Sequence, residues 1–427
     1  MLIQFTFSNF KCFREENTFN MVSLNTKHTN YYAHKTPFKY SILKTAAVFG
    51  ANASGKTKFF EAVNFMRNVI CPPVRDEKIP VYDYWQTKYD PFRLNQQSEN
   101  SGSSFEMVFL LNEIQYRYGF TINKNGILSE WLYKKKNRET LILSRQNGKD
   151  YYISRKYINI KIFNNIIAAN MVSASVPLLS ILATFNDPLS KDIVNWFNSI
   201  VVISANDMNA IGALVISENK KSITSFLKAF DINIEDITLH ETAIEQIPDK
   251  IKAIIKLDNF KGKFYDGINT THKVYNEYYE RVSNIDFSLE KDESFGTNRL
   301  FRISWPIIDS LKRGTVLFID EIDSGIHTNI VKIIITLYYL CNTTAQLVIN
   351  TQNASLLSAS DDNEHQLFRK DQIYLVNKNR YGESSVLPAT DFRNDFRSNL
   401  EKLYLNGDMT GVPYVDMGEL LNIVRNN

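Results

Sequence analysis

Cysteine and net charge are both scarce in this sequence. Its 427 residues include three cysteines, Cys12, Cys71 and Cys341, which lie far apart and form no CxxC pair. This spacing argues against a zinc site or a disulfide framework, and it indicates a reducing, cytoplasmic compartment. The formal net charge is only +3, whereas nucleic-acid binding by charge alone needs a concentrated basic face. Composition therefore excludes disordered, fibrous and disulfide-rich proteins, but it does not indicate a function.

The sequence also lacks the patterns that direct a chain to a membrane. Its first residues, MLIQFTFSNFK, show no basic region followed by an apolar stretch, so we expect no signal peptide. Residues 166–186 carry no charge over about the length of a membrane span. Polar residues and Pro177 interrupt this stretch. We therefore expect a buried pair of helices around Pro177 and no membrane partner.

Alternation of apolar and polar residues predicts the order of elements. The first 24 residues predict a β-hairpin, and residues 45–50 predict a buried strand that leads into a helix over 56–70. No fixed-period repeat or long heptad run is present, so no extended coiled coil is expected. Further strands are predicted at 105–111, 114–122, 127–135 and 140–145 in an antiparallel sheet, and at 199–204, 315–320, 346–351 and 372–378. The last three alternate with helices, which favours a mostly parallel sheet and an α/β fold.

The strongest motif is GANASGKT at 50–57, a complete GxxxxGK[ST] between a predicted strand and a predicted helix. Its glycines let the backbone wrap a phosphate, so that N–H groups and the helix N-terminus face negative charge. Lys56 supplies a charge for the β- and γ-phosphates, and the Thr57 hydroxyl is suited to Mg²⁺. The candidate residues for binding ATP are Gly50, Ala51, Asn52, Ala53, Ser54, Gly55, Lys56, Thr57 and Lys58.

An acidic pair follows the apolar strand TVLFI at 315–319. Asp320, at the strand tip, is predicted to hold Mg²⁺, and Glu321 to polarise the attacking water as general base. An acidic pair after a strand is otherwise a solvated turn, but the phosphate loop upstream favours the catalytic interpretation. We therefore assign Asp320 and Thr57 to the metal, and Glu321 and Lys56 to catalysis.

A third motif decides the class of ATPase. SFGTNRLF at 294–301 opens a predicted helix before the acidic pair and, taken alone, could be a plain N-cap. In this position it resembles the signature motif of ABC-type ATPases, including the SMC, Rad-fifty and RecF-like heads. The resemblance implies that Ser294 and Gly296 face nucleotide held by another subunit. It also places DSGIH (323–327) as the D-loop and Gln352 at the switch-histidine position.

A narrower resemblance covers nearly the whole chain. SNFKCF (8–13), GANASGKT, PFRL (91–94), FEMVFLLNEIQYRYGF (105–120), DEIDSGIH (320–327) and LFRKDQIYLVNKNRYGESS (367–385) are similar to one bacterial group. That group is the stand-alone AAA-type, RecF-like ATPases related to the overcoming-lysogenisation-defect ATPases. It implies an ABC/RecF-like P-loop head with an antiparallel β lobe and a helical insertion. It further implies Lys11 near the nucleotide and His327 as a D-loop histidine, although a lone histidine after a strand is more often structural.

The same resemblance implies a role in abortive infection, with ATP-dependent self-association, a separately encoded nuclease-like effector and a phage trigger protein. Glutamine cannot become cationic, so Gln352 predicts slow hydrolysis. We divide the chain into an N-terminal core part with the phosphate loop (1–90), the antiparallel lobe (90–160), the helical insertion (160–235) and a C-terminal core part (236–427).

Three alternatives stay open. The first is a RecF/SMC-like ATPase that clamps DNA, for which lysines at 134–138 and 250–263 offer contacts, although a solvated sheet edge or helix face is the favoured explanation of these lysines. The second is a restriction-type nuclease pattern of Asp207 with Glu218 and Lys220, for which 214–217 would be the strand. The third is a toxic nuclease of another kind. A fused Toprim domain is not expected, because the 75 residues after Gln352 contain no DxD pair.

Overall fold

The computed structural model describes residues 1–24, 29–72, 85–147, 150–205, 212–242, 264–358, 366–392, 400–411 and 417–418. The chain divides into two compact units. Unit 1 consists of Met1–Ser204, Arg313–Ile322 and Lys332–Asn427, and unit 2 consists of Ala205–Lys312 and Asp323–Val331. Each unit is described separately below. The four-part division expected from the sequence stays a prediction.

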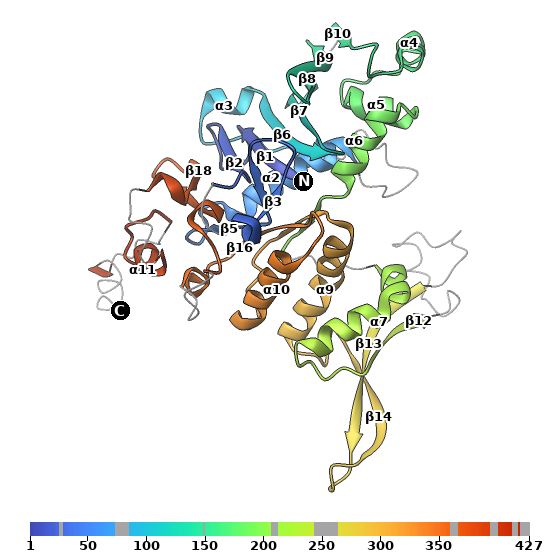
Figure 1. Cartoon of the computed structure of the whole chain (residues 1–427), viewed down its shortest axis with the longest axis vertical. Helices are drawn as coiled ribbons and strands as arrows, with labels where there is room; N and C mark the ends of the chain where they lie inside the picture. Colours follow the sequence, from blue (N-terminus) through green and yellow to red (C-terminus); the bar gives the residue numbers. More distant parts are fainter. Residues whose placement is uncertain are drawn as a thin grey trace. The chain divides into compact units, whose positions relative to one another are not determined.

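A mostly parallel six-stranded sheet forms the centre of unit 1 (Figure 1). Its order is β11 (Val201–Ile203), β15 (Val316–Ile319), β16 (Gln346–Asn350), β5 (Thr45–Phe49), β17 (Ile373–Lys378) and β18 (Ser384–Pro388). All pairings are parallel except that of β17 with β18. Strands β5, β15 and β16 are buried along their whole length, as expected for a parallel sheet covered on both faces. This arrangement confirms the predicted α/β class.

The second sheet of unit 1 is antiparallel and has seven strands. Its order is β10 (Asp150–Ile153), β9 (Glu139–Gln146), β8 (Gly126–Lys135), β7 (Ile114–Asn123), β6 (Ser103–Leu111), β1 (Leu2–Ser8) and β2 (Asn17–Asn20). The N-terminal hairpin and the four later strands predicted from the sequence are both present. They form one continuous sheet, because β1 pairs with β6 across about a hundred intervening residues. Alternation within each segment cannot reveal such a long-range pairing.

Helix α2 (Lys56–Ile70) joins the two sheets of unit 1. The ring of Phe59 packs on Phe5 and Phe7 of β1, with centroid separations of 6.2 and 6.0 Å. The ring of Phe60 meets Phe318 of β15 edge-on at 5.5 Å. Because α2 begins directly after the phosphate loop, this aromatic packing on both sides fixes the end of the helix that faces the candidate site.

The uncharged stretch 166–186 spans two different environments. It contains the end of α4 (Ile160–Ala168), an irregular segment and α5 (Leu178–Thr184), before α6 (Pro188–Asn198). Helix α5 is largely buried and starts after Pro177, as expected, whereas α4 buries only Ile166. Among the described residues, no helix is long and apolar enough to cross a membrane.

The shorter elements of unit 1 connect these layers. They are α1 (Thr29–Tyr32), β3 (Ala33–Lys35), β4 (Ser41–Leu43), α3 (Gln96–Asn100), α11 (Leu400–Leu405) and the 3₁₀ turns Ala354–Leu357, Lys370–Gln372 and Ala389–Asp391. Helix α10 (Thr328–Leu340) begins in unit 2 and continues into unit 1.

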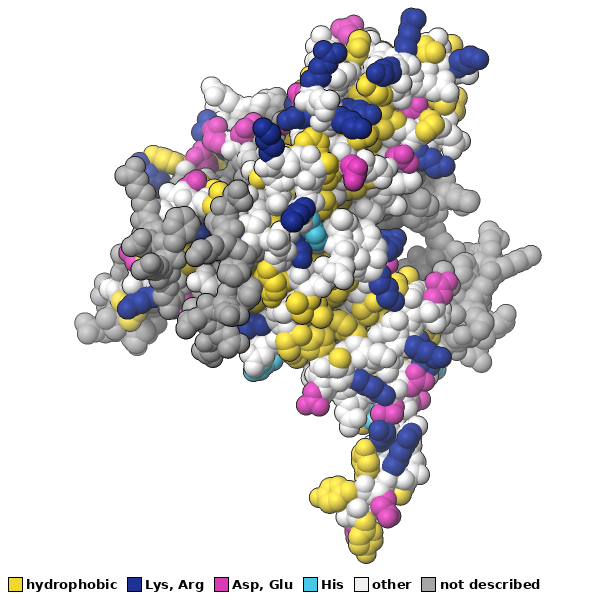
Figure 2. Space-filling view, viewed as in Figure 1, with side chains coloured by type: hydrophobic (Ala, Val, Ile, Leu, Met, Phe, Trp, Pro, Cys, Tyr) yellow, Lys and Arg dark blue, Asp and Glu magenta, His cyan; other side chains and the backbone are white. Residues whose placement is uncertain are grey.

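Unit 2 contains a three-stranded antiparallel sheet that the sequence patterns did not predict. Its strands are β12 (Asp236–Thr242), β13 (Phe264–Tyr275) and β14 (Arg281–Ser288), and it is accompanied by α7 (Ala213–Ala229) and α9 (Phe295–Arg313). The β13–β14 ribbon extends past the end of β12 and exposes Tyr278 and Tyr279 at its tip (Figures 1 and 2). Residues 214–217 lie in helix α7, so the prediction that they form the strand of a restriction-type nuclease pattern is wrong.

Two features named in the sequence analysis fall partly outside the described residues. Asp207 and the lysines between 250 and 263 lie there. Lys220, the basic member of the nuclease pattern, forms an ion pair with Asp236 at 2.6 Å.

Candidate functional site

A cavity of about 780 Å³ lies where four parallel strands of unit 1 end. The phosphate loop follows β5, Glu321 lies just beyond β15, Gln352 follows β16, and Lys378 ends β17. The carboxyl edge of an open parallel sheet is where such folds bind ligands. The described lining consists of Lys11, Cys12, Asn52, Ala53, Ser54, Gly55, Lys56, Thr57, Lys58, Asp90, Pro91, Phe92, Arg93, Leu94, Glu321, Gln352, Lys378 and Gly382.

Close backbone packing shapes the phosphate loop. A Cβ on Gly50 would lie 2.5 Å from the carbonyl oxygen of Val376, so only glycine fits there. Gly55 has φ 117°, and a Cβ would come within 2.8 Å of Cys12 Sγ. Ala53 also has a positive φ, of 60°. These conformations turn the chain sharply before α2, whose N-terminal N–H groups then face the cavity.

Lys56 is the first residue of α2 and is almost fully buried. Its Nζ donates hydrogen bonds to the carbonyl oxygens of Gly50, at 2.7 Å, and of Ala51, at 2.9 Å. The ammonium group therefore lies within the turn of the loop. A cation encircled by backbone at a helix N-terminus suits the binding of phosphate oxygens.

Thr57 and Asp320 come together across 263 positions of sequence. The Thr57 hydroxyl donates to Asp320 Oδ1 at 3.2 Å. Asp320 is 1% exposed, and its backbone N–H donates to the Ile203 carbonyl at 2.9 Å. A hydroxyl and a buried carboxylate side by side are hard oxygen ligands of the kind that Mg²⁺ prefers. The residues present therefore fit the predicted metal ion.

Asn350 is a site residue that the sequence analysis missed. Its Nδ2 contacts Asp320 Oδ1, and its Oδ1 accepts the backbone N–H of Glu321 at 2.8 Å. Asn350 is fully buried at the end of β16, and Glu321 has a left-handed φ of 48°. The signal available in the sequence was a polar residue directly after the apolar run LVI at 347–349, two positions before Gln352.

Lys11 and Lys58 line the cavity and share one carboxylate. Lys11 Nζ lies 2.8 Å from Glu61 Oε2, and Lys58 Nζ lies 2.8 Å from Glu61 Oε1. Burial alone would raise the pKa of Glu61, but the hydrogen bonds from the two lysines lower it below its usual value. The two ammonium groups are thus held next to the phosphate loop by a charged partner.

Other lining residues carried no assignment from the sequence. Cys12 lies beside Gly55, and burial raises the pKa of its thiol. Ser384 lies outside the cavity lining but contacts the loop, because its hydroxyl donates to the Ser54 carbonyl at 2.6 Å. Arg93, within the PFRL segment, forms an ion pair with Asp90 at 2.8 Å. SNFKCF and PFRL entered the sequence analysis only as parts of a resemblance, and folding places both beside the phosphate loop.

Ser294, Gly296 and His327 belong to unit 2. The Ser294 hydroxyl accepts the Thr297 backbone N–H at 3.0 Å, so Ser294 has the geometry of an N-cap for α9. A Cβ on Gly296 would lie 2.4 Å from the Gly325 carbonyl oxygen, which places the start of α9 directly against the D-loop. His327 is exposed, and its Nδ1 accepts the Asn329 backbone N–H at 3.2 Å near the start of α10.

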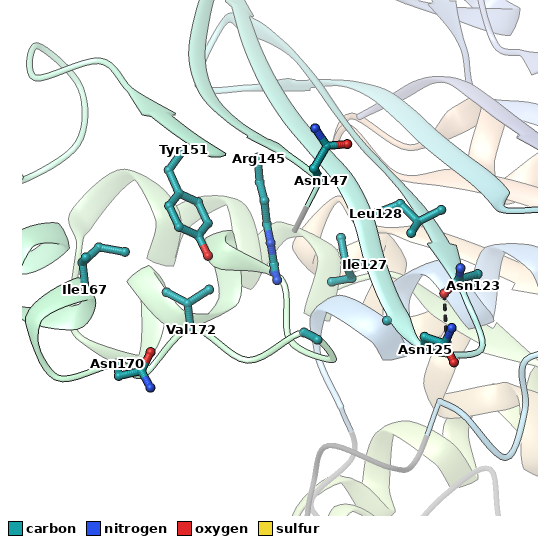
Figure 3. A pocket seen from close by; sticks show the side chains of 12 residues that line it. Asn123, Asn125, Ile127, Leu128, Arg145, Asn147, Tyr151, Ile167, Asn170 and Val172 are labelled. Atoms are coloured by element: carbon teal, nitrogen blue, oxygen red, sulfur yellow. Dashed lines mark hydrogen bonds between the residues drawn. The ribbon is translucent and has the colours of Figure 1, made fainter. Parts of the chain in front are cut away.

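A second cavity, of about 540 Å³, lies in the antiparallel lobe of unit 1 (Figure 3). The buried guanidinium of Arg145 reaches it and donates to the carbonyl oxygens of Ser173, at 3.0 Å, and Val176, at 3.1 Å. None of the residues predicted for the site lines this cavity. Its arginine holds the segment that leads into α5.

Comparison with protein families agrees with this geometry. Residues 46–358 match a family described as "AAA domain, putative AbiEii toxin, Type IV TA system". The chain belongs to this AAA family. The match begins in β5 and ends beyond Gln352, so it includes the phosphate loop, the signature and the acidic pair. No curated protein matches the chain.

Solved structures similar to this AAA family member include three SMC heads. One is the SMC head bound to the C-winged helix domain of ScpA, at 14% identity and a TM-score of 0.42, covering 90% of this chain and 96% of that one. The SMC head domain from Thermotoga maritima has 14% identity and a TM-score of 0.35, with coverages of 91% and 98%. The head with an extended coiled coil, bound to the C-terminal domain of ScpA from Pyrococcus furiosus, has 13% identity, a TM-score of 0.39 and 99% coverage of both chains.

The parallel sheet and the family match together confirm the predicted α/β class of this AAA family member. The chain is an α/β AAA domain with a phosphate loop, an antiparallel lobe and a group of helices after it. Families of this kind typically use ATP with Mg²⁺.

Proposed function

We propose that the protein binds ATP with Mg²⁺ in the 780 Å³ cavity and hydrolyses it. The observation that carries this proposal is the 3.2 Å contact between the Thr57 hydroxyl and Asp320, with Lys56 and Glu321 at the same cavity. A volume of this size is within the range of about 300–1,000 Å³ found for small-molecule sites.

Each residue has a defined part in this proposal. Backbone N–H groups of 50–58 and Lys56 bind the phosphates, while Thr57 and Asp320 hold the metal. When bound there, Mg²⁺ supplies charge neutralisation for the phosphate oxygens. Glu321 accepts a proton from the attacking water, and Gln352 orients that water without adding positive charge. Hydrolysis is therefore slow, and Lys11 adds positive charge near the nucleotide.

We infer further that two copies of the chain assemble on ATP. In this arrangement Ser294 and Gly296 of one copy complete the site that contains Lys56 of the other, with His327 in the adjoining D-loop. The exposed N-terminus of α9 supports this inference, because the start of a helix carries partial positive charge that favours an anion.

We propose that this assembly serves abortive infection in the bacterial cytoplasm. ATP-driven assembly would then sense a phage trigger protein and hold or release a separately encoded nuclease-like effector. The chain belongs to a family whose description names the AbiEii toxin, and this supports the role. We also propose that the protein is related to the overcoming-lysogenisation-defect ATPases. The alternative, DNA clamping, predicts that duplex DNA stimulates hydrolysis.

The catalytic part of the proposal is tested with two substitutions. Lys56→Ala removes the loop cation and is expected to abolish binding of a fluorescent ATP analogue. Glu321→Gln keeps the size of the side chain but removes the base, so binding persists while steady-state hydrolysis falls by about two orders of magnitude or more. Lys39→Ala, at an exposed lysine that lies outside the cavity lining, is the matched control for loss of one positive charge.

The outcomes of this test separate the assignments. Glu321→Gln protein that hydrolyses ATP at the wild-type rate would remove Glu321 from the mechanism. Lys56→Ala protein that binds the analogue normally would overturn the location of the site.

Co-purification from the native host, with and without infection, tests the effector and trigger.

A further inference from the structure

The connection between β14 and the signature helix α9 is folded tightly onto the sheet of unit 2. The Leu289 N–H donates to the Ile268 carbonyl of β13 at 2.9 Å, so the chain stays beside β13 after β14 ends. The Ser288 N–H donates to Asp292 Oδ2 at 2.7 Å, and the Asn298 side chain donates to the Leu289 carbonyl. These contacts hold residues 288–293 as a compact turn between the strand and α9.

Glu293 ends this turn and points back to β13. Its Oε1 accepts the Thr270 hydroxyl at 2.5 Å and lies 2.6 Å from His272 Nε2. Thr270 and His272 are two positions apart on one strand, so their side chains share a face. The Glu293 side chain is 10% exposed and that of His272 is 20% exposed. The His272 ring also packs on Phe287 of β14, at a centroid distance of 4.8 Å.

The position of this cluster in the sequence connects it to the signature. Ser294 follows Glu293 directly; its side chain is exposed, and its hydroxyl is held by Thr297 of the same helical turn. On the other side, Gly296 lies against the Gly325 carbonyl with no room for a Cβ. The start of α9 is therefore held from two sides, by Glu293 before Ser294 and by the D-loop after it.

We propose that Glu293, held by Thr270 and His272, is a positioning residue for the signature. It fixes the direction in which Ser294 and the first N–H groups of α9 face nucleotide bound by another copy. Side-chain hydrogen bonds to a carboxylate are short and directional, which suits a positioning role better than general packing would. The proposal rests on the proposed function, because it concerns assembly of two copies on ATP.

The test compares binding of ATP by the single chain with ATP-dependent assembly of the full-length protein. The variants are Glu293→Ala, Glu293→Gln, His272→Ala and His272→Gln, and the readouts are affinity for a fluorescent ATP analogue, sedimentation with ATP and Mg²⁺, and thermal unfolding. Glu290→Ala is the matched control, since Glu290 lies in the same turn, is exposed and, among the described residues, forms an ion pair only with Arg302, at 4.0 Å.

Glu293→Ala and His272→Ala are expected to raise the protein concentration for half-assembly about tenfold. Affinity for the analogue should stay at the wild-type value, because the phosphate loop is in unit 1. His272→Gln keeps a donor for Glu293 and should restore most of the assembly, and Glu290→Ala should assemble normally. A residue that served stability alone would lower the unfolding temperature and leave assembly of the folded fraction unchanged.

Ser294→Arg distinguishes the possible failures. If Ser294→Arg blocks assembly while Glu293→Ala and His272→Ala assemble normally, Glu293 is not a positioning residue and the proposed assembly stands. If all three assemble normally, the signature does not form the interface, and the proposed assembly and this inference fail together. Should Glu293→Ala fail to fold, His272→Ala decides the question in the same way. Glu293→Gln keeps an oxygen that accepts the Thr270 hydroxyl, so it should assemble nearly as the wild type does.

Discussion

At the scale of single residues, Asn350 connects the two acids that we propose bind the metal and act as the base. One side chain contacts the Asp320 carboxylate through its amide nitrogen and fixes the Glu321 backbone through its amide oxygen. The left-handed φ of Glu321 is unusual for a residue with a Cβ, and this hydrogen bond holds the backbone in that conformation. Asn350 thus couples the orientation of both acids to the end of β16.

Asn350→Ala removes both interactions and leaves the buried Asp320 carboxylate and the partly buried Glu321 N–H with fewer partners. We expect the free energy of unfolding to fall by about 1–3 kcal/mol, the typical cost of such a loss. The kcat for ATP should fall by more than affinity does, because Lys56 and the phosphate loop are untouched. Steady-state kinetics and urea unfolding measure the two effects. Asn353→Ala is the control, since Asn353 caps the turn at Ala354–Leu357 instead.

His34 gives a prediction about pH. Its Nε2 lies 3.1 Å from the Ala345 carbonyl, and burial lowers the pKa of its imidazole to about 4. The unfolded chain has the ordinary pKa of about 6.5, so it binds more protons than the folded chain between pH 6.5 and pH 4. The free energy of unfolding therefore falls as the pH drops through this window, by about 3 kcal/mol in total from this residue.

Urea unfolding of wild-type and His34→Gln protein between pH 7 and pH 4 measures this effect. Glutamine can donate to the same carbonyl and does not titrate. The difference in stability between the two proteins should shift in favour of the variant as the pH falls. A difference that stays constant with pH would show that His34 titrates normally.

At the scale of elements, a buried carboxylate joins the antiparallel sheet to α5. Glu130 of β8 accepts the backbone N–H groups of Leu178 and Leu179 at 2.8 and 2.9 Å, together with the Tyr118 hydroxyl at 2.9 Å. Helix α5 follows Pro177 and has no side-chain cap of its own. The sheet therefore supplies the N-terminal acceptor that α5 lacks, and negative charge there also complements the helix dipole.

Glu130→Ala should consequently destabilise this part of unit 1. The two N–H groups and the Tyr118 hydroxyl lose their common acceptor in a fully buried place, and we expect a loss of about 3 kcal/mol or more. Glu139→Ala, at the exposed end of the neighbouring strand β9, should cost about 1 kcal/mol or less. Chemical unfolding of both variants tests the contrast, and equal effects would contradict the capping role.

At the scale of the whole molecule, the cavity proposed to bind ATP and the proposed signature belong to different units of one chain. The phosphate loop, Asp320 and Glu321 are in unit 1, while Ser294, Gly296 and the D-loop are in unit 2. In the proposed assembly, bound ATP joins unit 1 of one copy to unit 2 of the other. Binding and assembly are then separable steps, and substitutions in unit 2 should affect only the second.

Ser294→Arg tests this separation in the Glu321→Gln background, where slow hydrolysis preserves the ATP-bound state. The Glu321→Gln protein should sediment as an assembly with ATP and Mg²⁺ and as a smaller species without ATP. Adding Ser294→Arg places a large cation at the exposed start of α9 and should prevent assembly without changing ATP binding or thermal unfolding. Undiminished assembly of the double variant would remove the signature from the interface.

The sequence by itself determined those elements that depend on residues close together in the chain. The phosphate loop, the helix over 56–70, the acidic pair after a buried strand and the four antiparallel strands all follow from motif spacing and short-range periodicity. This is possible because a strand, a turn or a phosphate loop depends mainly on residues that are neighbours in sequence. The α/β class followed from the same patterns.

Only the tertiary structure decided which distant residues meet. In the structure, β1 pairs with β6, and Asn350 contacts both acids. Cys12 lies beside Gly55. Glu293 contacts Thr270 and His272. In each case, the hydrophobic pattern within one segment carries no information about the distant segment that it contacts. The sheet of unit 2 was also missed, because an exposed ribbon such as β14 lacks the apolar alternation that marks a half-buried strand. Such contacts depend on how whole layers pack, which no short window of sequence specifies.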